Sequence, residues 1–261
     1  MNDLHLSIRY LVMRGRTYEE SVEQNVRYVE KMWTLPVNQV AIILVDMWGT
    51  HSYLSHLARG KQIITEKATA TVAAAREAGV SIIHAPSPDV AWKYPQTTSY
   101  STDKDREPQS IQSDSWPPDD FRTRTGSYHD YALTAPEDPP DVPEAEDIAE
   151  EIKPVASDYV VATGAQLHRL LKAKEILHLF YAGFATNECV RFRDYGMKNM
   201  RRMGYNTILL RDCTTAIENS YTVASEDMTK FSILDIERNS ATTTVASFIS
   251  ACEQLDMKGK D

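Results

Sequence analysis

Three side chains that can carry out acid–base or nucleophilic chemistry come soon after apolar, β-branched runs. They are the carboxylate of Asp46, the imidazole of His84 and the thiol of Cys189. The runs before them indicate strands of a parallel sheet that is covered on both faces. Ligands of open α/β sheets bind beyond the carboxyl ends of the strands, so we expect the three groups to meet at one edge.

The thiol of Cys189 is the strongest candidate for a nucleophile. It lies near the start of a helix predicted over 187–203. The free N–H groups and positive dipole end of a helix lower the pKa of a thiol and can stabilise an oxyanion. The other two cysteines, Cys213 and Cys252, are interpreted as buried structural residues.

Asp46 admits two interpretations. A carboxylate directly after a buried strand must be paired or desolvated, so it could cap a turn or act as the general base for the thiol. Asp212 also follows a strand, but its position before a helix favours a structural cap.

Strands and helices alternate along most of the chain, which predicts βαβ units and a parallel sheet. We expect an α/β protein with a three-layer α/β/α sandwich and a mostly parallel six-stranded sheet. The predicted strands are 39–45, 80–84, 158–162, 177–182, 206–210 and 241–244, and the predicted helices are 62–78, 164–174, 187–203, 221–235 and one ending near 255. On helix 187–203, the residues expected to face inward are Cys189, Phe192, Gly196, Met200 and Met203.

Two segments depart from this pattern within one domain over 1–261. Residues 1–38 form an N-terminal extension with a strand near His5–Met13 and a helix over Tyr18–Met32. Residues 85–150 hold ten of the twelve prolines and too few aliphatic residues for a core of their own. Long loops of this kind are usually functional or disordered, so we interpret 85–150 as an insertion over the active edge.

Composition excludes several classes of protein. The 261 residues include 28 basic and 37 acidic side chains, a net charge of −9 without a basic block, so no nucleic-acid partner is expected. No apolar run is long enough for a membrane span, and no signal-peptide pattern begins the sequence. Three cysteines without a CxxC pair argue against disulfides and favour a reducing cytoplasm.

Three segments together resemble the isochorismatase-like cysteine hydrolases, a family that includes nicotinamidases and N-carbamoyl amide hydrolases. The first is an apolar strand that ends in Asp46. The second, Gly183-Phe-Ala-Thr-Asn-Glu-Cys189-Val, is similar to the family signature around the nucleophile, and the third is Gly204-Tyr-Asn-Thr-Ile-Leu-Leu-Arg-Asp212. The order of strands and helices agrees from about 38 to 250.

The resemblance implies a role for each residue of the signature. Cys189 would attack an amide-like carbonyl, and Asp46 would carry the proton from the thiol to the leaving amine. The backbone N–H groups of Ala185 and Cys189 would form the oxyanion hole, and the Phe184–Ala185 peptide bond would be cis. The family also implies a homo-oligomer, a dimer or tetramer, and no cofactor.

One departure from the family is clear. The family carries a catalytic Lys at the end of the third strand, where this sequence has Ala162 and Thr163. Without a cation, burial should raise the pKa of Asp46. Three explanations remain open: His51 or His84 replaces the Lys, Lys93 or Lys104 reaches in from the insertion, or the amidase chemistry is weakened.

Further residues are expected to line the substrate pocket: His51 and Trp48 from the loop after Asp46, together with His84, Phe184, Thr163 and Trp116. The segment Ser115-Trp-Pro-Pro-Asp119 is similar to a nicotinamidase motif, but Asp119 stands where that motif has a metal-binding His. No metal is therefore expected.

The leading hypothesis is a hydrolase of a small amide, ureido or carbamoyl substrate that works through a thioester at Cys189. An alternative is an inactive family member that binds a small molecule or a protein. A third is a metal-assisted hydrolase that uses Asp46, His51 and His84.

Overall fold

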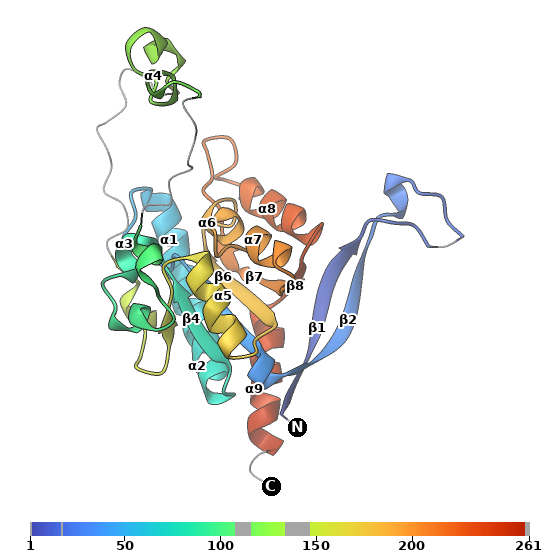
Figure 1. Ribbon diagram of the computed structural model, residues 1–261. Coiled ribbons are helices and arrows are strands. Elements are labelled where there is room, and N and C mark those ends of the chain that lie inside the picture. The colour runs from blue at the N-terminus through green and yellow to red at the C-terminus, as the bar shows by residue number, and fades with distance from the viewer. Residues whose placement is uncertain (1, 17, 108–115, 134–146, 259–261) are drawn as a thin grey trace.

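Six neighbouring strands of the sheet are parallel in the computed structural model, which describes residues 2–16, 18–107, 116–133 and 147–258 (Figure 1). From one edge inward they are β5 (Tyr159–Val160), β4 (Ser81–Ala85), β3 (Val40–Val45), β6 (His178–Phe184), β7 (Asn206–Thr215) and β8 (Ala241–Thr243). The predicted α/β class is confirmed. All six residues of β3 are buried, as expected for a strand covered on both faces.

Helices cover both faces of the sheet and complete three layers. One face carries α1 (Leu54–Ile63), a π-helical turn (Ile64–Ala68), α2 (Thr69–Glu77) and α9 (Val245–Lys258); the other carries α5 (Gly164–Ala173), α7 (Met197–Arg202) and α8 (Asp227–Glu237). Alternate side chains of β3 point to opposite faces of the sheet. Ile42 and Leu44 pack with α2 and α9, whereas Ile43 and Val45 pack with α5 and α7. The three-layer prediction is therefore confirmed.

The N-terminal extension differs from its prediction. β1 (Asp3–Val12) and β2 (Arg27–Pro36) form an antiparallel hairpin whose first strand pairs with β8, so the described sheet has eight strands rather than six. The helix expected over Tyr18–Met32 is wrong. Partly buried Val29 and Trp33 and buried Leu35 share one face of β2, which fits a strand, but Lys31 interrupts the apolar pattern on that face.

The helix predicted over 187–203 is also wrong in its extent. It is divided into α6 (Cys189–Phe192) and α7, with a turn at 193–196 between them. Phe192 and Met203, expected to face inward, are 45% and 50% exposed. The carboxylate of Asp194 accepts a hydrogen bond from the N–H of Gly164 (2.6 Å), which holds the turn against the start of α5.

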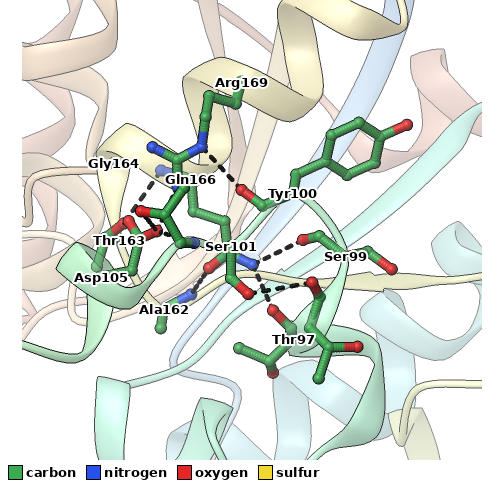
Figure 2. Close-up of polar contacts among 12 residues, drawn as sticks. Thr97, Ser99, Tyr100, Ser101, Asp105, Ala162, Thr163, Gly164, Gln166 and Arg169 are labelled. Atoms are coloured by element: carbon green, nitrogen blue, oxygen red, sulfur yellow. Dashed lines mark hydrogen bonds and ion pairs between the residues drawn. The ribbon is translucent and has the colours of Figure 1, made fainter.

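The first part of the insertion is fixed to the body of the domain. It contains α3 (Pro88–Ala91) and short 3-10 turns up to Arg106, and a second described part contains α4 (Asp119–Arg122). The buried amide of Gln166 on α5 donates to the carbonyls of Thr97 (2.8 Å) and Ser99 (3.0 Å) and accepts from the N–H of Ala162 (2.8 Å) (Figure 2). This network holds the insertion beside the carboxyl end of β5.

Candidate active site

Asp46 occupies the first position after β3 and has an unusual backbone. Its φ angle is 43°, in the left-handed region that non-glycine residues rarely adopt, and its N–H donates to the carbonyl of Ala85 (3.2 Å). The side chain is buried, and neither carboxylate oxygen has a hydrogen-bond partner of good geometry among the described residues. A buried carboxylate without well-formed hydrogen bonds is unfavourable for stability and is typical of a functional group.

Asp46 and Cys189 line the same cavity, which has a volume of about 300 Å³. The thiol lies close enough to the carboxylate for each group to shift the pKa of the other. The remaining lining residues are Trp48, His51, Ser52, Ser87, Ala185, Glu188, Arg193 and Ile217. Strands β3, β4 and β6 end at this edge, so the expected convergence of Asp46 and Cys189 is observed.

The thiol of Cys189 differs from its prediction. Burial, the charge of Asp46 and the contact with its carboxylate raise the pKa of Cys189 to about 12. The helix that follows has only four residues, so it cannot supply the dipole of a long helix. The raised pKa favours the protonated thiol, so attack by this sulfur requires a neighbouring base to take its proton.

The carboxyl group of Asp46 has a raised pKa because burial disfavours its charge. The Cys189 thiol, the guanidinium of Arg193 and the backbone N–H of Ser87 act in the opposite direction and favour the carboxylate. A base with a raised pKa is a better proton acceptor near neutral pH than an ordinary aspartate.

The turn after β6 places two backbone N–H groups at the cavity. The Phe184–Ala185 peptide bond is cis, at the position named from the resemblance. The N–H groups of Glu188 (3.0 Å) and Val190 (3.2 Å) donate to the carbonyl of Ala185, which holds Ala185 next to Cys189. Within the described chain, the N–H groups of Ala185 and Cys189 themselves have no backbone acceptor, so they can donate to a ligand.

Arg193 is one of five cavity residues that the sequence did not single out; the others are Ser52, Ser87, Glu188 and Ile217. Its guanidinium contacts the Cys189 side chain and interacts with the charge of Asp46. Burial opposes its charge, but Tyr195, Cys189 and Asp46 outweigh burial and raise the pKa of Arg193. The spacing of four residues from Cys189, about one helical turn, was the available signal.

Aromatic rings form one wall of the cavity. The rings of Trp48 and His51 are 4.4 Å apart, and the N–H of Tyr53 donates to Nδ1 of His51 (3.0 Å). Phe184 does not line the cavity but packs behind Trp48, with ring centroids 6.1 Å apart. This wall offers a flat surface for a planar group.

Three predicted pocket residues lie elsewhere. His84 is buried, with Nε2 3.3 Å from the carboxylate of Asp158, and does not line the cavity. Thr163 caps α5 by accepting from the N–H of Gln166 (3.0 Å), and Trp116 is 72% exposed. None of the three lines the cavity of Asp46 and Cys189, and Thr163 lines the neighbouring cavity instead.

The structure also shows where the residues proposed to replace the family Lys, and those proposed to bind a metal, lie relative to the cavity. Neither Lys93 nor Lys104 lines the cavity, and His84 lies outside it. In the described part of the chain, no three His, Cys, Asp or Glu side chains are arranged to hold a metal ion. The set Asp46, His51 and His84 therefore does not converge, and the metal-assisted alternative has no support from the arrangement.

Comparisons with known proteins agree with this architecture. The family model described as Isochorismatase domain matches residues 40–246. A cysteine hydrolase from Pseudomonas syringae pv. phaseolicola 1448A is 20% identical with a TM-score of 0.53, covering 85% of this chain and 96% of its own. An isochorismatase family protein from Burkholderia thailandensis is 18% identical with a TM-score of 0.53, covering 83% and 96%.

Two searches add negative findings. Curated proteins gave no match to this chain. Among the described helices, none has both the length and the apolar character that crossing a membrane requires.

Proposed function

Because this chain belongs to the isochorismatase family of hydrolases, we propose that it cleaves a small amide, ureido or carbamoyl C–N bond through a thioester at Cys189. One observation carries the proposal: the buried Asp46 carboxylate, without a hydrogen-bond partner of good geometry, faces the Cys189 thiol in one cavity. A base beside a nucleophile is the arrangement that thioester chemistry requires.

The first half of the reaction forms the thioester. Asp46 accepts the thiol proton as the sulfur attacks the carbonyl carbon, and the N–H groups of Ala185 and Cys189 donate to the oxyanion. Asp46 then passes the proton to the leaving nitrogen, the C–N bond breaks and the amine or ammonia departs.

The second half regenerates the enzyme. Asp46 takes a proton from water as the water oxygen attacks the thioester carbon. The C–S bond breaks, the acid leaves, and the sulfur recovers the proton from Asp46. One water is consumed, and neither a cofactor nor a metal is needed in this scheme.

The size and walls of the cavity limit the substrate. A volume of about 300 Å³ suits a small molecule, and the rings of Trp48 and His51 offer an aromatic wall against which a planar amide or ureido group can pack. We propose a small-molecule substrate and a homo-oligomeric enzyme with no nucleic-acid or membrane partner.

The test is turnover of a panel of primary amides, ureides and N-carbamoyl amino acids, with ammonia release as the readout. We expect wild type to turn over at least one compound, and Cys189→Ala and Asp46→Asn to lose at least 100-fold, in line with loss of a nucleophile or base. Cys213→Ala, which changes a buried cysteine outside the cavity, is the matched control.

Mass spectrometry separates this function from a binding role. A substrate-derived acyl adduct on Cys189 during turnover supports the thioester. Equal binding of a compound by wild type and Cys189→Ala, with no product and no adduct across the panel, would instead identify a binding protein.

A further inference from the structure

The active cavity contains one cation, Arg193, among its lining residues, and this residue also lines a second cavity of about 420 Å³. The second cavity is bounded by Ala162 and Thr163, the two residues that stand where the family carries its catalytic Lys. Arg193 therefore lies between the end of β5 and the pair formed by Asp46 and Cys189.

The backbone around Arg193 is fixed on several sides. Its carbonyl accepts from the N–H of Gly196 (2.8 Å) and from Nδ2 of Asn199 (2.9 Å), and its N–H donates to the carbonyl of Cys189 (3.2 Å). The next residues are held as well, because the hydroxyl of Tyr195 donates to the carbonyl of Pro86 (2.9 Å). A guanidinium that starts from a fixed backbone is preorganised for an electrostatic role.

The side chain of Arg193 is directed at the reacting groups. It contacts the Cys189 side chain and interacts with the charge of Asp46, and it lines the cavity that holds both groups. Among the described residues, the guanidinium of Arg193 forms no ion pair with a carboxylate outside the site, unlike Arg9, Arg76, Arg169 and Arg191.

We infer that Arg193 is the catalytic cation of this site, which keeps Asp46 ionised and stabilises the thiolate of Cys189 in place of the lysine absent from the end of β5. The inference rests on the proposed function. It identifies the cation that replaces the family Lys, for which the sequence suggested only His51 or His84, or a lysine of the insertion. Arginine keeps its charge at every pH at which the enzyme is stable, so it acts by its field and cannot serve as a proton donor.

The chemistry follows from charge balance. With Asp46 ionised, its negative charge is balanced by the positive charge of Arg193, and the thiol between them is neutral. Transfer of the thiol proton to Asp46 moves the negative charge onto sulfur, still beside the same guanidinium. The other titratable groups that face this pair are His51, Glu188 and Tyr195.

The test compares Arg193→Gln with Arg193→Lys, because the first removes the charge and the second keeps it. The rate of iodoacetamide alkylation at Cys189 is followed from pH 6 to pH 10 by mass spectrometry. An opposite charge within hydrogen-bonding range shifts a pKa by about 1–3 units. We therefore expect Arg193→Gln to slow alkylation at pH 8 about tenfold or more and to move its pH profile upward, and Arg193→Lys to remain near wild type.

A matched control comes from α6, the short helix that directly precedes Arg193. Arg191 pairs with Asp235 and does not line the active cavity, so Arg191→Gln should leave the alkylation profile unchanged. The buried thiols of Cys213 and Cys252 serve as unreactive internal standards in each sample. Circular dichroism melting of each variant identifies loss of reactivity that follows from unfolding.

The outcomes separate this inference from the proposed function. Equal profiles for Arg193→Gln and Arg193→Lys, both like wild type or both altered, overturn the role of the charge. If Arg193→Gln does not fold, a wild-type profile for Arg193→Lys supports the inference and a shifted one overturns it. An alkylation rate that Asp46→Asn leaves unchanged, in contrast, counts against Asp46 as the base and so against the proposed function itself.

Discussion

The α-carbon of Gly183 packs against the carbonyl oxygen of Val45, so closely that an added methyl group would lie 1.8 Å from that oxygen. Gly183 also has a φ of 121°, a conformation that side-chain-bearing residues avoid. Val45 precedes Asp46, and Gly183 lies two residues before Ala185. This contact therefore sets the spacing between the candidate base and the candidate oxyanion hole.

Gly183→Ala is expected to lower the free energy of unfolding by on the order of 3 kcal/mol or more, because overpacking and backbone strain act together. Gly204→Ala is the control, since Gly204 has a φ of 98° but nothing within 4 Å of an added methyl group. It should cost only about 1 kcal/mol. Urea denaturation measures both, and equal losses would show that the contact with Val45 is unimportant.

Asp46→Asn is expected to stabilise the protein while it abolishes turnover. The folded-state pKa of Asp46 is raised by burial, so the folded state binds the proton more tightly than the unfolded chain. Stability then falls as pH rises from the unfolded pKa through the folded pKa, and at pH 7 the charge opposes folding. We therefore expect Asp46→Asn to melt at a higher temperature than wild type at pH 7, with each 1 kcal/mol gained raising Tm by about 2–4 °C.

Asp158→Asn should have the opposite effect on stability. Although burial opposes its charge, contacts with His84, the Val155 N–H and Arg76 hold the pKa of Asp158 below its usual range. Its contribution is present above the unfolded pKa and is lost as pH falls through the folded pKa. Melting curves of Asp46→Asn and Asp158→Asn at pH 7 test these two opposite predictions. A lower Tm for Asp46→Asn than for wild type would contradict the assignment of Asp46 as a strained base.

Gln166→Ala is expected to release the first part of the insertion. The substitution leaves the carbonyls of Thr97 and Ser99 and the N–H of Ala162 without their partner (Figure 2). A loss of on the order of 3 kcal/mol should result, because buried backbone groups are costly when unpaired. Hydrogen exchange should rise over residues 95–106, whereas Gln254→Ala, at an exposed site on α9, should change neither quantity.

Trp48→Leu and Trp116→Leu distinguish the wall of the cavity from the exposed tryptophan. Trp48 lines the cavity against His51, whereas Trp116 is 72% exposed and lines neither the active cavity nor its neighbour. For a substrate found in the panel, we expect KM to rise about two- to tenfold for Trp48→Leu, the value of one aromatic contact. An equal change in KM for Trp116→Leu would show that the insertion covers the site.

Local patterns predicted much of the fold. Fully apolar runs such as Val40–Val45 indicated strands buried on both faces, and their alternation with helices gave the parallel three-layer arrangement. Local patterns gave the wrong element where contacts with segments distant in the sequence determine the secondary structure. The segment 27–36 is a strand because β1 lies beside it, and the helix after Cys189 ends early because Asp194 binds the start of α5.

The sequence by itself determined that Asp46 and Cys189 follow parallel strands, and parallel strands all end at the same edge of a sheet. It could not determine what surrounds them, because pKa values and cavity walls depend on burial and on charges that are distant in the chain. Only the tertiary structure turned His84 toward Asp158, raised the pKa of the Cys189 thiol through burial, and brought Arg193 to the cavity beside Ala162. The reason is physical: backbone pattern follows local hydrophobicity, whereas the electrostatics of a site follow three-dimensional distance.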